Sequence, residues 1–350
     1  MSPTRRLAFL DALRGAAATW VVLFHFGDGG QITRLRAALP SWLDQSIFAA
    51  GHFGVPVFFV LSGFVIARSI GDGHVTPRYV GRFALRRAIR LDIPYWASIA
   101  VVLAFVALKR LALPAAVQPT TSPGDVLAHM FYLQEFLGLH PINPVYWTLT
   151  YEVQFYLLFC VLLGVAHALR HTPGDRRPEA AVFTFAAVVA IAWPLIPALH
   201  ARGIALINWY AFLLGAFASW SLSGRLHPRW VALFAVALLA VWSRTRDSFI
   251  IACLATAMLI ILVGRAGSLS NCGDSWLPQF LGKISYSLYL LHVPVSGAAF
   301  SLLSRLWDAT VVHDVLAALI VLVINCVTAW CFWWLAERPS TALARRLRER

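Results

Sequence analysis

Apolar runs long enough to cross a membrane recur along the whole chain, and this feature most limits what the chain can fold into. A hydrocarbon core of about 30 Å needs about 20 apolar residues in a helix. The 350 residues are 59% apolar and 13% charged, whereas soluble domains carry about 25% charged residues. A single anchor on a soluble domain is therefore excluded. The sequence predicts an all-α polytopic membrane protein.

About ten membrane-spanning helices are expected from the apolar runs and from the Pro, Gly and charged residues that interrupt them. The run at residues 229–243 is short for the hydrocarbon core, so nine and eleven crossings stay open as alternatives. Asp11 and Arg14 interrupt the first run where a secretory signal needs its apolar centre, so we interpret that run as a retained helix. The expected spans are 7–26, 47–70, 94–112, 145–168, 181–198, 205–221, 229–243, 248–265, 278–300 and 313–336.

Basic residues are concentrated on one side of these spans when the N-terminus is placed in the cytoplasm, and the positive-inside rule then puts both termini there. We expect one transmembrane domain over residues 1–340 and a basic cytoplasmic tail over 341–350. The net charge of +13 comes without a zinc spacing, a basic recognition helix or an RNA-binding motif, so the lipid bilayer is an expected partner and nucleic acid is not. Five cysteines without paired spacing favour neither a disulfide framework nor a metal site.

Two connections stand apart from the short ones. Residues 71–93, on the cytoplasmic side, hold several arginines at spacings of three and four, which predicts a basic amphipathic helix. Residues 113–144, on the outer side, are rich in Pro and Thr and are expected to lie over the mouth of a cavity. No internal repeat is visible, which weakens the interpretation as a transporter built from inverted halves.

The first span carries three ionisable side chains, Asp11, Arg14 and His25. At 100° per residue all three face the same way, and the helical rise separates Arg14 from His25 by about 16 Å. Ionisable groups at membrane depth cost about 2.5–3.5 kcal/mol even on lenient scales, so we expect them to face a polar cavity that the helices surround. The alternative is that Asp11 and Arg14 form a structural pair within the helix and that His25 marks its interfacial end.

Ser62 and the basic stretch each allow two interpretations. Ser62 and Gly63 let a backbone or a ligand approach the second span closely, and for Ser62 by itself packing is favoured. Arg86, Arg87 and Arg90 are suited to bind anionic lipid headgroups. They are equally suited to bind the phosphates of a nucleotide-bearing donor.

Glu152 is the only acid in the fourth span, and Tyr156 shares its helix face. Since this helix is expected to run from outside to inside, Glu152 should lie in the outer half of the bilayer, close in depth to His25. For Trp147 and Tyr151, at the start of the span, an interfacial aromatic belt is the favoured interpretation.

The last two spans add two further motifs. The ninth span holds residues 285–292, with Tyr286 near its start and His292 in the middle of the membrane. A lone histidine at that depth suits a hydrogen-bonded structural residue as well as a catalytic one. Glu337, Arg338 and Pro339 are expected to end the tenth span, where Arg338 is interpreted as a topology determinant.

Five of these segments, in this order, resemble the acyltransferase 3 family of integral membrane acyltransferases. The resemblance covers most of the chain, from residue 10 to residue 339, and Thr148 stands where Ser is often found. The segments are the Arg-then-ten-then-His pattern at 14–25, the FFxxSGF-like 58–64, the RRxxR-like 86–90, the WxLxxExxFY-like 147–156 and the SYSLYLLH-like 285–292.

The resemblance implies a ten-helix bundle that takes acyl groups, often acetyl, from cytoplasmic coenzyme A thioesters and places them on carbohydrate or other acceptors, commonly at the extracytoplasmic side. It also implies that His25 and Arg14 are the functional His and Arg and that Glu152 is the fourth-span acid. We expect a bacterial inner membrane protein that uses acyl-CoA as a co-substrate and has no tightly bound cofactor and no metal. Nothing after the last span resembles the SGNH hydrolase-like domain of some members, so a stand-alone form is expected.

The expected reaction is O-acylation of a carbohydrate or lipid-linked sugar, with His25 as general base and with Glu152 and Asp11 completing the catalytic set. A covalent acyl-histidine intermediate stays open as a variant. The main rival is a membrane transporter or exporter of a small polar or acylated solute, because charges within the membrane also mark solute pathways. The side chains expected to bind the substrates are Arg14, Ser62, Arg86, Arg87, Arg90, Trp147, Tyr156, Tyr286 and His292.

Overall fold

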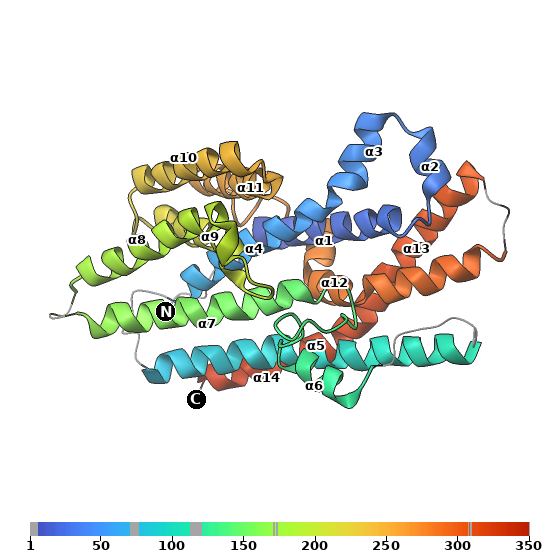
Figure 1. Ribbon diagram of the computed structural model, residues 1–350, viewed down its shortest axis with the longest axis horizontal. Helices are drawn as coiled ribbons and strands as arrows, with labels where there is room; N and C mark the ends of the chain where they lie inside the picture. The colour runs from blue at the N-terminus through green and yellow to red at the C-terminus, as the bar shows by residue number, and fades with distance from the viewer. Residues whose placement is uncertain are drawn as a thin grey trace. The chain divides into compact units, whose positions relative to one another are not determined.

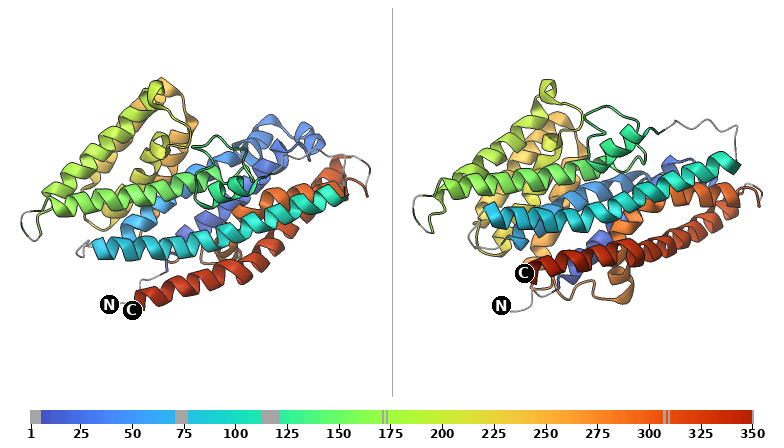
Figure 2. Two further views of the ribbon diagram at one scale, coloured as in Figure 1. Left: turned by 60° about the horizontal axis from the view of Figure 1, so that its bottom comes forward. Right: turned by 90° about the horizontal axis from the view of Figure 1, so that it is seen from below.

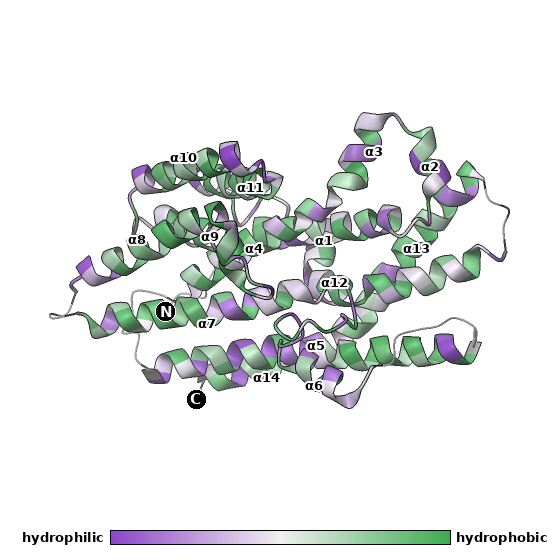
Figure 3. Ribbon diagram, in the orientation of Figure 1, coloured by the Kyte–Doolittle hydropathy of each residue, from purple (hydrophilic) through white to green (hydrophobic). Residues whose placement is uncertain are grey.

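All regular secondary structure in the described part of the chain is helical. The structure is a computed structural model that describes residues 6–70, 77–112, 121–170, 172, 174–306, 308 and 310–349. Within these residues, nine helical segments are long and apolar enough to cross a membrane. Most of the ribbon carries the hydrophobic colour in Figure 3. The expected all-α polytopic membrane protein is confirmed.

The helices follow the expected spans closely (Figure 1). The seventh expected span forms α10, an 18-residue helix that is not among the nine, and Arg229 and Arg244 near its two ends lower its mean hydropathy. The helices in chain order are α1 (Ala8–Asp28), α2 (Thr33–Ala38), α3 (Ser41–Ile47), η1 (Ala49–Phe53), α4 (Gly54–Ser69), α5 (Pro77–Ala112), α6 (Pro123–Met130), α7 (Trp147–Ala168), α8 (Arg177–Ala192), η2 (Trp193–Leu195), η3 (Pro197–Leu199), η4 (Ala205–Asn208), α9 (Trp209–Leu222), α10 (Pro228–Thr245), α11 (Ser248–Arg265), α12 (Trp276–Leu303), α13 (Val311–Phe332), η5 (Trp333–Glu337) and α14 (Arg338–Glu349).

The basic stretch is not a separate helix, which corrects the expectation for residues 71–93. Residues 77–93 and the third apolar run form the single 36-residue helix α5, which passes through Pro94; residues 71–76 lie outside the described residues. Proline removes one backbone hydrogen bond, but neighbouring groups in a membrane protein can satisfy the freed carbonyl. The carbonyl freed here is that of Arg90, and the Ser340 hydroxyl lies 3.5 Å from its oxygen.

Glu337, Arg338 and Pro339 do not end the tenth span as expected. The helix passes through the five-residue π-helical turn η5, which ends at Glu337, and continues as α14. Figure 2 shows α13 and α14 as one continuous red ribbon. Pro339 follows directly on this π-helical turn, where the regular α-helical hydrogen bonding is already interrupted.

The chain divides into two units. The first unit comprises Met1–Leu10, Pro56–Arg87 and Thr148–Cys272, and the second comprises Asp11–Val55, Ala88–Trp147 and Gly273–Arg350. In the first unit, α4 and α9 cross at two glycines. A Cβ atom added to Gly63 would lie 1.9 Å from the Phe212 carbonyl oxygen, and one added to Gly215 would lie 1.9 Å from the Val60 carbonyl oxygen. Only glycine permits this backbone contact.

The second unit contains a similar crossing between α1 and α12. A Cβ atom on Gly15 would lie 2.6 Å from the Gly282 backbone nitrogen, and one on Gly282 would lie 2.2 Å from the Asp11 carbonyl oxygen. The first span is thereby held against the ninth at the level of Asp11, which fixes the helix that carries Arg14 and His25.

Tyrosine side chains hold the connection before α7 against the helices of the second unit. The Tyr95 hydroxyl donates to the His129 carbonyl at 2.9 Å, and the Tyr132 hydroxyl donates to Asp92 at 2.7 Å. The Tyr289 hydroxyl donates to the Val145 carbonyl at 3.1 Å. Residues 113–120 of the expected outer connection lie outside the described residues, while its remainder contains α6.

Candidate functional site

His25 and His292 lie beside each other in the second unit. His25 is near the end of α1 and His292 is in the middle of α12, and their ring centroids are 5.0 Å apart at an interplanar angle of 43°. His25 is partly exposed, whereas His292 is completely buried. The sequence motifs placed both residues on a list of candidates, and the structure brings them together.

The tautomer of His292 follows from its hydrogen bonds. Its Nδ1 lies 3.1 Å from the Leu288 carbonyl oxygen and 2.9 Å from the Tyr289 carbonyl oxygen. Carbonyl oxygens only accept hydrogen bonds, so Nδ1 carries the hydrogen and Nε2 carries a lone pair. Among the described residues no group hydrogen-bonds to Nε2. His292 therefore has a buried hydrogen-bond acceptor on a ring that lies beside the His25 ring.

Arg14 belongs to a second polar cluster in the same unit, centred on Glu337. Glu337 is 6% exposed and accepts a hydrogen bond of 2.7 Å from the Ser287 hydroxyl. Arg14 and Arg90 lie close enough to interact electrostatically with the Glu337 carboxylate. One buried carboxylate thus lies between arginines from two helices, an arrangement that lowers the cost of holding guanidinium groups within a membrane protein.

The place of Glu337 in this cluster is not predicted from the sequence, where Glu337 is expected only to end the tenth span. The available signal is that an acid at the end of an otherwise apolar run is unusual. The π-helical turn that contains Glu337 is a second indication, because such turns are frequent at functional sites. Ser287, which hydrogen-bonds to Glu337, lies inside the 285–292 motif that also contains Tyr286 and His292.

Glu152, Ser62 and Tyr156 form a hydrogen-bonded cluster in the first unit. The Ser62 hydroxyl of α4 donates to Glu152 Oε1 of α7 at 2.8 Å. The Tyr156 hydroxyl donates to the same carboxylate oxygen, and it lies 3.5 Å from the Ser62 Oγ. The Ser62 side chain is therefore engaged with Glu152, while Gly63 provides the close packing with α9.

The three arginines of the basic stretch have different surroundings along α5. Arg87 lies over the Tyr156 ring, with its guanidinium carbon 4.4 Å from the ring centroid, which joins it to the Glu152 cluster. Arg90 lies in the second unit near Glu337, and its carbonyl oxygen is 3.5 Å from the Ser340 hydroxyl. Arg86 is partly buried on the same helix. A cation over an aromatic face is attracted by about 0.5–2 kcal/mol.

The remaining predicted residues are placed as follows. Asp11 is partly buried at the α1–α12 crossing. Trp147 is the partly buried first residue of α7. The Tyr286 hydroxyl donates to the Leu91 carbonyl at 3.0 Å. The expectation that Glu152 lies close to His25 concerns residues of different units and stays a prediction.

The histidine pair has the chemistry of proton transfer, and the arginines around Glu337 have that of anion binding. Imidazole groups can take up and release a proton near neutral pH, and a buried lone pair beside one of them can fix its orientation. Guanidinium groups bind carboxylates and phosphates. Among the described residues, no group of three or more His, Cys, Asp or Glu side chains could hold a metal ion.

Comparison with known proteins identifies the family. The acyltransferase domain model matches residues 7–334. A putative membrane-bound transacylase, BcsY, of Komagataeibacter xylinus is 28% identical over 317 residues, which cover 83% of this chain and 73% of that protein. The exopolysaccharide production protein ExoZ of Rhizobium meliloti is 31% identical over 261 residues, which cover 70% of this chain and 76% of that protein.

A third relative is longer than this chain. The O-acetyltransferase OatA of Staphylococcus aureus is 25% identical over 352 residues, which cover 84% of this chain and 51% of that protein. No solved structure matches the chain. The family match spans the described helices from α1 to α13, which carry His25, His292, Glu152 and Ser62, and it ends just before Glu337. The chain therefore belongs to the acyltransferase 3 family of membrane acyltransferases.

Proposed function

We propose that this membrane acyltransferase moves an acyl group, in the first instance acetyl, from acyl-CoA to a hydroxyl group of a carbohydrate-type acceptor. The names of the relatives support the acceptor class, since one is an O-acetyltransferase and another is an exopolysaccharide production protein. A lipid-linked sugar is included in this class. Acyl-CoA is proposed as the donor because the basic stretch carries several guanidinium groups, which can bind the phosphates of a nucleotide-bearing thioester.

The pair of His25 and His292 is the observation that carries the proposal. A histidine acting as a general base needs one ring nitrogen free for the substrate and benefits from a partner that fixes the other. His292 supplies an acceptor at Nε2, since its own hydrogen is committed to the backbone at Nδ1. The ring centroids are 5.0 Å apart, and His25 is proposed to donate to that acceptor. The other nitrogen of His25 is then the base.

The proposed reaction step is a single displacement at the thioester. His25 takes the proton of the acceptor hydroxyl while the oxygen attacks the thioester carbonyl carbon. The carbon–sulfur bond breaks, and the sulfur leaves as coenzyme A thiol with the proton that His25 had taken. The products are the ester and free coenzyme A, and His25 returns to its neutral form.

The remaining assignments rest on the sequence motifs and the local contacts. Arg86, Arg87 and Arg90 are proposed to bind the phosphates of the donor, and Arg14 its pantetheine arm. Glu152, held by Ser62 and Tyr156, is proposed to position the acceptor or to orient the imidazole. Asp11, Trp147 and Tyr286 are proposed to support the substrate site. The protein is proposed to lie in a bacterial inner membrane with both termini in the cytoplasm, as the distribution of basic residues favours.

Transfer in detergent tests the proposal. Purified protein is incubated with radiolabelled acetyl-CoA and a pool of bacterial surface glycans, and labelled ester is counted after extraction. Wild-type protein is expected to form labelled ester, and His25→Ala is expected to form none. His52→Ala is the matched control. The His52 side chain is exposed, and its ring contacts Phe24, not His292, so this variant is expected to have wild-type activity.

The same assay separates the enzyme from a transporter. A transporter needs two sealed compartments, so ester formation in detergent micelles excludes transport as the sole activity. Near wild-type transfer by His25→Ala would overturn the assignment of the base. The acceptor is identified by mass spectrometry of surface glycans from cells with and without the protein, where an acetyl group adds a fixed mass.

A further inference from the structure

A pocket in the first unit, lined by none of the residues of the Glu152 cluster, has the features of a binding site for a charged amphiphile. It has a volume of about 390 Å³ and lies among α8, α9 and the first half of α10. None of the residues assigned above to catalysis or to donor and acceptor binding lines it. Its volume falls in the range of about 300–1,000 Å³ that is typical of small-molecule sites.

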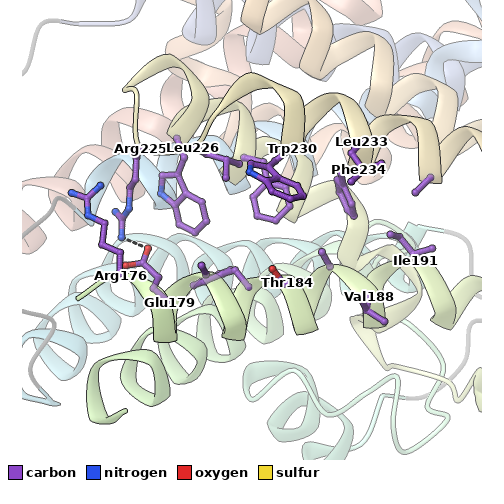
Figure 4. Close-up of a pocket in the computed structure, with 16 residues that line it drawn as sticks. Arg176, Glu179, Thr184, Val188, Ile191, Arg225, Leu226, Trp230, Leu233 and Phe234 are labelled. Carbon is purple, nitrogen blue, oxygen red and sulfur yellow. Dashed lines mark hydrogen bonds and ion pairs between the residues drawn. The ribbon is translucent and has the colours of Figure 1, made fainter. Parts of the chain in front are cut away.

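One end of the pocket is lined by apolar side chains. Figure 4 shows Val188 and Ile191 of α8 facing Trp230, Leu233 and Phe234 of α10 across it. Several of these side chains are exposed on the protein surface, so they meet lipid when the helices are in a membrane. The pocket therefore offers a groove in which a hydrocarbon chain can lie.

The opposite end carries a cluster of charges around Glu179. Glu179 is 7% exposed, and its carboxylate oxygens pair with Arg170 at 3.0 Å and with Arg225. Arg176 lines the same end, while Asp175 accepts a hydrogen bond from the Arg177 backbone nitrogen. The pocket lining thus contains two guanidinium groups, those of Arg176 and Arg225, and one carboxylate, that of Glu179. The same carboxylate also pairs with Arg170, which is not part of the lining. The charged end keeps an excess of positive charge.

Two helix N-termini lie at this charged end. α8 begins at Arg177 and α10 begins at Pro228, and the pocket is lined at this end by residues just before or within their first turns. Each N-terminus carries a partial positive charge and unpaired backbone N–H groups. Figure 3 shows the hydrophilic colour concentrated at this end of α8. The helix starts therefore add to the preference for an anion.

Trp220 lies between the two ends of the pocket. Its side chain lines the pocket, the Arg225 guanidinium carbon lies 5.0 Å from the ring centroid, and the residue is 6% exposed. A cation over an aromatic face is attracted by about 0.5–2 kcal/mol, so the Trp220 ring helps to hold the Arg225 guanidinium group beside the pocket.

We propose that the pocket binds one anionic diacyl phospholipid from the leaflet into which its charged end opens. The phosphodiester lies by Arg176 and Arg225, and one acyl chain follows the apolar groove. A zwitterionic lipid matches the groove equally but brings a cationic group to the arginines. Basic pockets between membrane helices commonly select anionic headgroups in this way. The proposal is independent of the transfer reaction.

Native mass spectrometry of the full chain tests the site. Protein reconstituted with equal amounts of phosphatidylglycerol and phosphatidylcholine is extracted mildly, and retained lipid is counted. Wild type is expected to retain one phosphatidylglycerol molecule. Arg176→Gln is expected to retain about fivefold less, since one arginine near the headgroup contributes about that factor. Arg177→Gln is the matched control, because it removes the same charge one residue away and does not line the pocket.

A second pair of variants tests the groove. Ala237→Trp fills the apolar part and is expected to abolish retention, whereas Ala232→Trp, on an exposed part of α10 outside the pocket, is expected to retain lipid like wild type. Size-exclusion chromatography confirms that each variant is folded. Equal retention of the two lipids, or equal loss in Arg176→Gln and Arg177→Gln, overturns the proposal. The proposal is also overturned if the wild type forms a lipid-free dimer that Ala237→Trp dissociates, because the pocket then binds a second copy of the chain.

Discussion

The imidazole rings of His25 and His292 lie side by side with their centroids 5.0 Å apart, and the hydrogen of His292 is held at Nδ1, which leaves Nε2 as an acceptor. This relationship links α1 to α12 within the second unit. It gives His292, which the sequence left undecided between a structural and a catalytic role, a definite proposed task. That task is to hold His25 in the orientation and tautomer in which it accepts a proton.

His292→Asn is expected to lower kcat about 100-fold while the protein stays folded. The asparagine amide can still donate to the Leu288 or Tyr289 carbonyl, but it removes the acceptor that faces His25. The pH profile of kcat is the informative readout, because loss of a positioning partner shifts the apparent pKa of the base. Wild-type kcat with an unchanged pH profile would show that His292 only fills space.

Ser287→Ala is expected to destabilise the protein more than Ser285→Ala. Both serines are completely buried on α12. The Ser287 hydroxyl donates to the Glu337 carboxylate at 2.7 Å, while the Ser285 hydroxyl donates to the Gly282 carbonyl at 2.8 Å within its own helix. A hydrogen bond to a charged group contributes about 1.5–3 kcal/mol and a neutral one about 0.5–1.5 kcal/mol. Thermal unfolding in detergent measures the difference, and equal midpoints for the two variants would contradict it.

Gly282→Ala is expected to disrupt the α1–α12 crossing and to abolish transfer. A Cβ atom there would lie 2.2 Å from the Asp11 carbonyl oxygen, so the two helices must separate. Gly297→Ala is the control on the same helix, because nothing lies within 4 Å of its added Cβ atom. Alanine favours a helix over glycine by about 1 kcal/mol, so this control is expected to be neutral or slightly stabilising. Similar activity of the two variants would show that the crossing is not needed.

The sequence predicted most of the fold because hydrophobic length is a local property. Each expected span corresponds to a helix, since about 20 apolar residues have no other stable arrangement in a membrane. The two errors lie at Pro94 and Pro339, where proline predicts a break but the helix continues. Continuation through a proline depends on neighbouring groups and on a π-helical turn, and neither is visible in a local pattern.

The sequence predicted most residues of the candidate site, but only some of the contacts between them. Glu152 and Tyr156 are four residues apart, so helical geometry alone placed them together. The partners Ser62 and Arg87 come from other helices, as do His292 for His25 and Glu337 for Arg14. Such pairs depend on which helices pack together, and a single sequence does not encode that in its hydrophobic pattern.

Acid pH is expected to loosen the segment between α6 and α7 through His129. His129 is completely buried, its Nδ1 donates to the Asp125 carbonyl at 2.7 Å, and its Nε2 accepts from the Ile142 backbone nitrogen at 3.1 Å. Burial lowers the pKa of His129, and the bond to Asp125 and the charge of Asp125 oppose the shift only in part. The unfolded segment therefore binds a proton at higher pH than the folded one. The stabilising effect is complete above about pH 6.5 and is lost as the pH falls toward the folded pKa.

Hydrogen exchange at the Ile142 amide, followed from pH 7.5 to pH 5, measures this effect after correction for the intrinsic exchange rate. His129→Gln is expected to remove the pH dependence and to cost about 1 kcal/mol at pH 7.5. His140→Gln, at an exposed histidine in the same segment, is expected to keep the wild-type dependence. Protection at Ile142 that does not change with pH in the wild type would contradict the assignment.

Arg87→Gln is expected to raise the KM for acyl-CoA about tenfold and to leave the KM for the acceptor nearly unchanged. Arg87 is proposed to bind a donor phosphate, and a charge-assisted hydrogen bond contributes about 1.5–3 kcal/mol. Its place over the Tyr156 ring, 4.4 Å from the centroid, holds the guanidinium group in a fixed position on α5. Arg87→Lys keeps the charge but loses the planar stack, so an intermediate KM is expected. Arg82→Gln, an exposed position on the same helix, is the control for charge alone. If all three variants keep the wild-type KM for the donor, while their activity depends on anionic lipid, the basic stretch binds lipid headgroups instead and the donor phosphates must be held elsewhere.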